Sequence, residues 1–214
     1  MKKETLRMIP DILFFAAIWG IVEATVGYAL HWIPGPLLAG SIMFPFAMLI
    51  LLQAYKRLES RKALLAIGVL AALIKSVNLL MPNLNQFNVI NPMIAIVLET
   101  AVVTAVAALF VSRRTPVQIG AIFTASIGWR VLYLAWHGYQ FIATGFVAFQ
   151  LRSLANAFEF TMIEGVLSGA LAVGLYFGFE AFKGRSALRL RIQPGVAGAM
   201  FALALILTPL MEML

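Results

Sequence analysis

The sequence predicts an all-α integral membrane protein, a polytopic bundle of six or seven transmembrane helices, and three observations support this prediction. Hydrophobic residues make up 62% of the 214 positions and charged residues only 12%, whereas a soluble domain is about 45–50% apolar and about 25% charged. Several apolar runs approach the roughly 20 residues that cross the hydrocarbon core of a bilayer. Breaker-rich or basic segments separate these runs. Residues 1–214 therefore form a single transmembrane domain.

The first predicted span, residues 11–30, follows a charged start that resembles a signal peptide. We interpret it as a retained helix because Glu23 lies inside the apolar run and no small-residue cleavage site stands out. The His31-Trp32-Ile33-Pro34-Gly35-Pro36 segment ends this helix, since proline lacks the N–H donor and fixes φ. The second span, 38–55, contains Pro45, which we expect to kink it.

The third span, 63–81, ends where Met81-Pro82-Asn83 breaks the helix. Two further apolar runs, 91–112 and 117–136, give the fourth and fifth spans. They are separated by a basic segment that contains Arg113 and Arg114.

The sixth predicted span, 155–182, admits more than one interpretation. The apolar stretch from Phe141 to Phe182 is too long for one crossing. Segment 138–158 therefore lies outside the membrane, re-enters it or extends the helix, and six spans plus a re-entrant segment is the alternative topology. The seventh span, 194–212, opens at Gln193-Pro194-Gly195, where proline suits the first turn of a helix.

The basic residues predict the orientation of the chain. Thirteen of the 16 lie in segments that alternate along the spans: Lys2, Lys3, Arg7, Lys56, Arg57, Arg61, Lys62, Arg113, Arg114, Lys183, Arg185, Arg189 and Arg191. The opposite loops, 31–37, 82–90 and 137–150, contain none. The positive-inside rule places the N-terminus in the cytoplasm, in the cytoplasmic (inner) membrane of a cell. The net charge of +7 thus orients the chain in the lipid bilayer, and we expect no nucleic-acid partner.

Seven of the charged residues inside or beside the spans need an explanation: Glu23, Lys75, Glu99, Arg130, Arg152, Glu159 and Glu164. Each costs at least about 2.5–3.5 kcal/mol at a helix centre, so each needs a partner or a water-filled cavity. Counting from the span ends puts most of them in the outer half of the bilayer. Residues three or four apart share a helix face, and polar stripes surround these charges. We therefore predict one ligand pocket open to the outside, formed by Trp19, Glu23, Lys75, Asn78, Asn91, Glu99, Arg130, Tyr133, Asn156, Glu159 and Glu164.

Other interpretations of these residues stay open. The charges alternatively pair with one another and only fix helix register. The segment Asn91–Glu99 is echoed by Asn156–Glu164 with the same spacing, which fits either a parallel internal repeat or chance likeness of apolar helices. His31 and His137 lie at outer span ends, where a haem or metal site is the less favoured alternative to interfacial histidines. We expect no cofactor.

Enzyme signatures are absent from the sequence, which contains no Gly-x-Ser-x-Gly, His-Glu-x-x-His or phosphate-binding glycine loop. With no cysteine, the chain is neither a disulfide scaffold nor a cysteine-ligated metal protein.

Ala16, Gly20 and Ala24 recur at intervals of four in the first span. Such small residues let another helix approach closely. With this stripe, its basic inner loops and its polar outer pocket, the chain resembles the substrate-binding S components of energy-coupling factor vitamin transporters. The resemblance implies that the stripe docks a transmembrane coupling subunit driven by cytosolic ATPases, and that the pocket holds a vitamin, a precursor or a similar solute. That family usually has six spans, so the span at 194–212 is a departure.

The sequence therefore favours a transport subunit that captures a small polar solute from the outer face. Two alternatives belong to other classes: an intramembrane enzyme with Glu99 or Glu164 as acid or base, and a structural subunit of a larger membrane complex. Neither the ligand nor the oligomeric state follows from the sequence.

Overall fold

The computed structural model describes residues 2–31, 38–82, 84–111, 114–185 and 192–213. These residues form helices and short connecting turns, and no strand occurs among them. The helices are α1 (Lys2–Val22), η1 (Glu23–Gly27), α2 (Tyr28–His31), α3 (Leu38–Leu58), α4 (Arg61–Ser76), η2 (Val77–Leu80), α5 (Gln86–Val106), η3 (Ala107–Val111), α6 (Thr115–Thr144), η4 (Phe149–Leu151), α7 (Leu154–Phe158), η5 (Glu159–Ile163), α8 (Glu164–Arg185) and α9 (Pro194–Glu212).

Seven helices in the described ranges are long and apolar enough to cross a membrane, and they follow the order of the seven predicted spans. They are Arg7–Leu30, Gly40–Leu58, Arg61–Leu80, Gln86–Phe110, Thr115–Thr144, Leu154–Lys183 and Pro194–Glu212. Outward-facing apolar side chains, such as Leu73, Val131, Ile163 and Ile206, suit a lipid environment. The all-helical fold class is confirmed, and the helices are compatible with a multi-pass membrane protein.

The segment 138–158, which the sequence left open, lengthens two helices and turns between them. Helix α6 continues to Thr144 and ends at Gly145, whose φ of 74° permits the left-handed turn that closes a helix. The Ser153 side chain accepts a hydrogen bond from the Asn156 N–H at 3.0 Å and caps α7. The described backbone thus links two long helices through a turn and the short helices η4 and α7.

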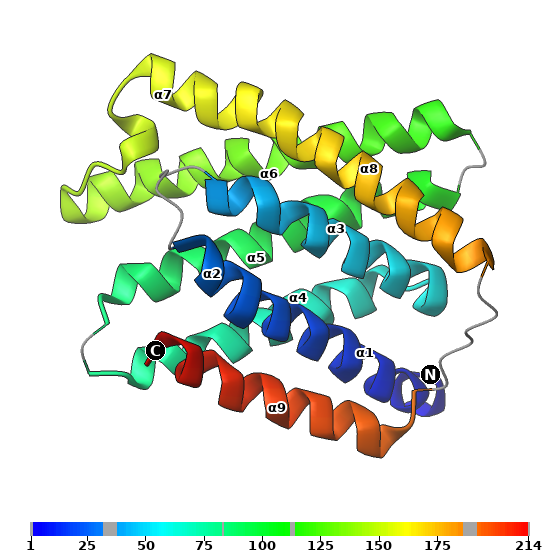
Figure 1. The fold of residues 1–214 in the computed structure, drawn as a ribbon. Helices are drawn as coiled ribbons and strands as arrows, with labels where there is room; N and C mark the ends of the chain where they lie inside the picture. The colour runs from blue at the N-terminus through cyan, green and yellow to red at the C-terminus, as the bar shows by residue number, and fades with distance from the viewer. Residues whose placement is uncertain (1, 32–37, 83, 112–113, 186–191, 214) are drawn as a thin grey trace.

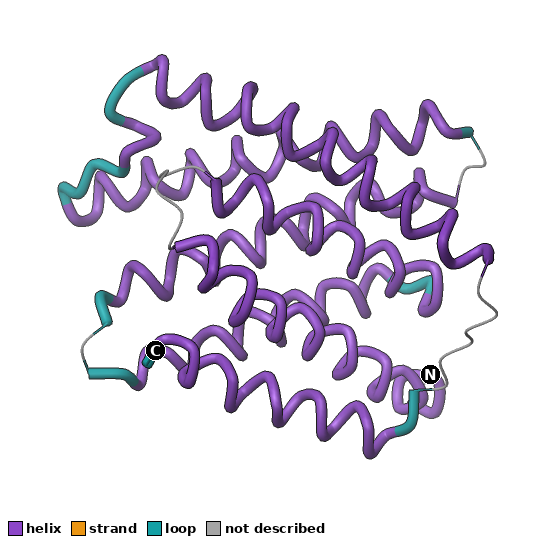
Figure 2. The backbone as a smooth tube through the Cα atoms, in the orientation of Figure 1, coloured by secondary structure: helices purple, strands orange, loops and turns teal. Residues whose placement is uncertain are grey.

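The long helices pack in two layers. One layer contains α9, α1, α3 and α8 side by side, and the other contains α4, α5 and α6 (Figure 1). The layers meet where α4 packs on α1, α5 on α3 and α6 on α8. Figure 2 shows the helices running across the molecule, with the two labelled chain ends at opposite ends of the bundle.

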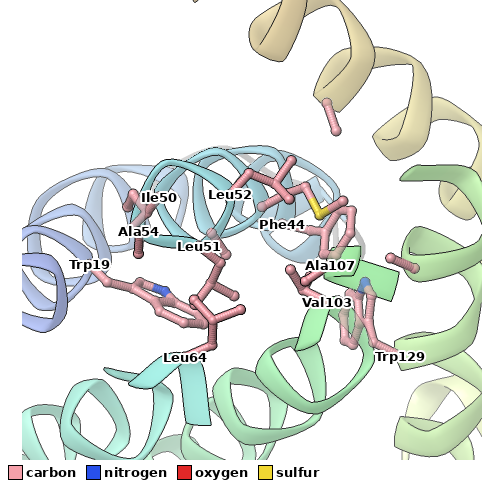
Figure 3. Close-up of a cluster of buried hydrophobic side chains, with 14 of the residues drawn as sticks. Trp19, Phe44, Ile50, Leu51, Leu52, Ala54, Leu64, Val103, Ala107 and Trp129 are labelled. Atoms are coloured by element: carbon pink, nitrogen blue, oxygen red, sulfur yellow. The ribbon is translucent and has the colours of Figure 1, made fainter. Parts of the chain in front are cut away.

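A continuous apolar core joins the layers (Figure 3). At one side Trp19 packs near Leu51 and Leu64, and at the other Phe44 stacks on Trp129 with ring centroids 6.2 Å apart. Both tryptophans are almost fully buried. Trp19 therefore serves as a core side chain in this structure.

The stripe of small residues on α1 packs inside the protein. Ala16, Gly20 and Ala24 are all buried. A Cβ added at Gly20 would lie 2.9 Å from Ile74 Cδ1 of α4 and 3.4 Å from Ala204 Cβ of α9. The face that the resemblance assigns to a coupling subunit is thus covered by two helices of the same chain.

Candidate functional site

A charged cluster occupies the interior between α3, α6 and α8. Arg130 lies midway along the 30-residue α6 and is completely buried. Its Nη2 donates to Ser41 Oγ at 3.2 Å, and Ser41 Oγ donates to Glu164 Oε2 at 3.1 Å. One hydroxyl from α3 therefore connects a cation on α6 with a carboxylate on α8.

The guanidinium is held in place on its other sides. Arg130 Nη1 donates to the Ser126 carbonyl at 2.9 Å, and Ser126 Oγ donates to the Gly165 carbonyl at 2.7 Å. The ring of Trp129 lies 4.6 Å from the guanidinium carbon and that of Phe160 lies 5.6 Å away. Cation–π contacts of this kind gain strength when they are desolvated. This packing fixes the arginine in a single position.

Two more acidic residues act on this cluster. Glu99 of α5 is buried, and its carboxyl lies within electrostatic range of Glu23 and Arg130. The Tyr133 hydroxyl in turn lies within range of Glu99. Glu23, Glu99, Arg130 and Glu164 come from four long helices, and each lies within electrostatic range of at least one of the others.

Two short π-helical turns mark the acidic side of the cluster. The turn η1 begins at Glu23, and η5 ends one residue before Glu164. In each turn a threonine hydroxyl donates to the carbonyl four residues earlier, Thr25 to Ile21 and Thr161 to Ala157, both at 2.7 Å. Turns of this type inside α-helices are frequent at functional sites.

Several buried polar atoms near Arg130 have no hydrogen-bond partner among the described residues. They are Arg130 Nε, Glu164 Oε1, Trp129 Nε1 and Ser168 Oγ. A buried polar atom without a partner costs about 1–3 kcal/mol, more for a charged group. Native proteins keep few of them, and each calls for an explanation such as a strained or functional group.

A second polar network lies beyond Arg130 toward the end of α6. Asn91 Oδ1 accepts from Gln140 Nε2 at 2.6 Å and from Trp136 Nε1 at 3.1 Å. Gln140 Oε1 lies 2.8 Å from His137 Nδ1, and the His137 ring packs edge-on against Tyr133 with centroids 4.4 Å apart. The predicted residues Asn91 and Tyr133 thus belong to this network, which lies between the charged cluster and the Thr144 end of α6.

The structure places Lys75 and Asn78 elsewhere. Lys75 Nζ pairs with Glu212 Oε1 of α9 at 3.1 Å, and Asn78 Nδ2 donates to the same oxygen at 3.2 Å. These two residues therefore connect α9 to the C-terminal end of α4 and to η2. Their contacts fit the alternative in which the charges pair only to fix helix register.

Asn156 and Glu159 also lie apart from the buried cluster. The Asn156 side chain donates to the Phe149 carbonyl at 3.0 Å and stabilises the turn before α7. Glu159 is exposed at the start of η5, within electrostatic range of Glu164. Arg152 is exposed too, near the ring of Phe149 at 5.7 Å.

The structure describes the side chain of one of the two histidines, His137. His137 is buried and bonded as described above. The side chain of His31 lies outside the part of the chain that the structure describes. No group of three or more His, Asp or Glu side chains suited to a metal occurs in the described ranges.

Sequence reasoning missed three members of the cluster: Ser41, Trp129 and Phe160. One signal for Ser41 was present, because Pro45 follows it by four residues. Proline cannot donate the backbone bond that a helix directs to the carbonyl four residues earlier. Ser41, four residues before this proline, was therefore a candidate functional residue. Its partner Glu164 lies 123 residues further along the chain, and no local pattern in the sequence predicts that pairing.

No family model, no curated protein and no solved structure matches the chain. The chemistry of the site is therefore inferred from its own residues.

Proposed function

We propose that this protein is a multi-pass transport protein of the cytoplasmic membrane, with its N-terminus in the cytoplasm, that binds a small polar solute at the Arg130–Glu164 cluster. The unpaired Arg130 Nε and Glu164 Oε1 in a buried position carry the proposal. They offer one hydrogen-bond donor and one acceptor to a solute.

The way the charges meet argues against a purely structural role. A pair that only fixes helix register gains most when its two charged groups bond directly. Arg130 and Glu164 instead meet through the Ser41 hydroxyl, and each keeps an unpaired atom. Intramembrane charges that face the bundle interior commonly mark solute or ion pathways.

The position of Ser41 suggests the route of entry. It is the fourth residue of α3, close to the end of the bundle that the basic residues leave free. Lys56, Arg57, Arg61 and Lys62 lie around the opposite end, where α3 ends and α4 begins. With the basic end in the cytoplasm, the solute enters from outside.

A coupling subunit with cytosolic ATPases remains a predicted partner. Such a subunit would have to contact a surface other than Ala16, Gly20 and Ala24, because α4 and α9 cover that face. The proposal of solute capture does not depend on this partner.

Native mass spectrometry of the protein purified from membranes of its own host tests the proposal. The wild-type chain is expected to retain a small molecule, and Arg130→Ala is expected to lose it while remaining helical and monodisperse. Arg57→Ala is the matched control, since Arg57 pairs with Asp11 at 2.9 Å at the other end of the bundle. Retention of the same mass by folded Arg130→Ala would contradict the proposal.

A further inference from the structure

The spacing of the charges in the cluster narrows the class of solute. Ser41 Oγ lies 3.2 Å from Arg130 Nη2 and 3.1 Å from Glu164 Oε2. Because the two hydrogen bonds run in series through the Ser41 hydroxyl, Arg130 Nη2 and Glu164 Oε2 are at most about 6.3 Å apart. A solute that binds both charged groups must therefore have its two charges close together.

Each charged side chain has one unpaired atom, and the two differ in sign. Arg130 Nε is a donor that, together with a neighbouring Nη, forms the planar fork that carboxylates prefer. Glu164 Oε1 is an acceptor that suits a protonated amine. The same site therefore offers a place for a negative group and a place for a positive one.

The charge balance separates three kinds of solute. Arg130 lies between two carboxyl groups, Glu99 and Glu164, that both act on it. A simple anion would leave Glu164 Oε1 buried and unpaired, whereas a simple amine would leave Arg130 Nε buried and unpaired. A molecule that has both charges satisfies both atoms and adds no net charge.

Aromatic rings border the cluster on one side. Trp129 lies 5.7 Å from Tyr133 and 6.0 Å from Phe160 between ring centroids, and Tyr133 and Phe160 are also 6.0 Å apart. Three rings at these distances present an apolar surface next to the charged atoms. This surface suits an apolar or aromatic side chain on the solute.

We infer that the solute is a zwitterion with a carboxylate close to a protonated amine, of the class of α-amino acids with an apolar side chain. The carboxylate accepts from Arg130, the ammonium donates to Glu164, and the side chain lies against Trp129, Tyr133 and Phe160. This inference rests on the proposed function and specifies the solute class for the same site.

Binding of two matched chemical series to the purified wild-type protein tests the inference. The first series is L-phenylalanine, 3-phenylpropanoate and 2-phenylethylamine, and the second is L-leucine, 4-methylpentanoate and 3-methylbutylamine. At least one amino acid is expected to bind about tenfold or more tightly than both of its analogues, because each analogue leaves one buried charged atom unpaired. An analogue that binds as tightly as its amino acid overturns the inference, and so does the absence of binding by both amino acids.

Two variants test which residue binds which charged group of the solute. Glu164→Gln is expected to remove the preference for the amino acid over the carboxylate, and Arg130→Ala the preference over the amine. Glu180→Gln is the matched control, because Glu180 lies on the same helix as Glu164 but far from the cluster. There its carboxylate pairs with Lys56 of α3 at 2.8 Å. An unchanged preference in folded Glu164→Gln counts against the inference.

These experiments distinguish failure of the inference about the solute class from failure of the proposed function. If both series fail while Arg130→Ala still loses the solute seen by mass spectrometry, only the zwitterion is overturned. If folded Arg130→Ala keeps that solute, the proposed function itself is overturned.

Discussion

Arg130 has a full positive charge in a position with no exposed surface. Its charge is balanced by neighbours from several helices: hydroxyl and carbonyl oxygens, two aromatic faces and two carboxyl groups. In an apolar environment such contacts decide whether the charge is tolerated. The cluster therefore contributes to folding as well as to the proposed binding of a solute, and its residues differ in how much they contribute to each.

Ser126 is the residue whose role is mainly structural. Ser126→Ala removes the bond to the Gly165 carbonyl and one contact of Arg130, so the free energy of unfolding is expected to fall by about 0.6–1.7 kcal/mol. Reversible denaturation in mixed micelles measures this change. Ser76→Ala is the control, since its hydroxyl bonds only to Leu73 within its own helical turn. Equal losses for the two variants would refute the role of Ser126.

The individual charged residues were predictable from the sequence to different degrees. Glu23, Glu99, Arg130 and Glu164 stood out because ionisable groups are rare in apolar helices, and depth alone placed them near one another. Lys75 stood out for the same reason, but its partner Glu212 belongs to a helix 137 residues further along the chain. Depth is readable from a sequence, whereas the face that each helix turns toward another depends on packing.

Helices α4 and α5 approach each other closely at Gly68. A Cβ added at Gly68 of α4 would overlap the side chain of Thr100 on α5. Glycine is needed here because only a residue without a side chain lets the two backbones come so near.

The ends of the helices were harder to predict than their presence. Helix α6, for example, continues for eight residues past the predicted end at 136, because apolar residues continue past the end of the span.

Substitution of Gly68 tests this packing. Gly68→Ala is expected to lower the free energy of unfolding by about 1–3 kcal/mol, the usual cost of overpacking. Gly174→Ala on α8 is the matched control, since an added Cβ there meets no atom within 4 Å and alanine favours the helix. Thermal unfolding followed by circular dichroism compares them. A stable Gly68→Ala variant would show that α4 and α5 separate without cost.

At the scale of the whole molecule, seven long apolar helices put the two described ends of the chain at opposite ends of the bundle (Figure 1). The junction of α3 and α4, which contains Lys56, Arg61 and Lys62, lies at the end of the bundle that also holds the N-terminus (Figure 1). The number of long apolar helices follows from composition, which is why the sequence predicts six or seven of them. The order of helices within the two layers does not, because every apolar face is equivalent in lipid.

Cysteine labelling tests the orientation, and the chain offers a clean background because it contains no cysteine. In intact cells, a membrane-impermeant maleimide is expected to label Phe146→Cys, whereas Lys62→Cys is expected to react only in inverted vesicles. Three spans separate these positions, so they lie on opposite sides. Ile206→Cys, within α9, is the unlabelled control. Labelling of both sites from one side would disprove the odd number of crossings between them.

The bond between Lys75 and Glu212 has a consequence for biogenesis. During synthesis at about 5–20 residues per second, the 137 residues from the one after Lys75 to Glu212 itself take roughly 7–27 s to make. When the third span leaves the ribosome, Glu212 has not yet been made, so the ammonium of Lys75 needs water or another carboxylate as its partner. The arrival of α9 both supplies the Glu212 carboxylate and covers Gly20, so α9 docks onto helices that were made before it.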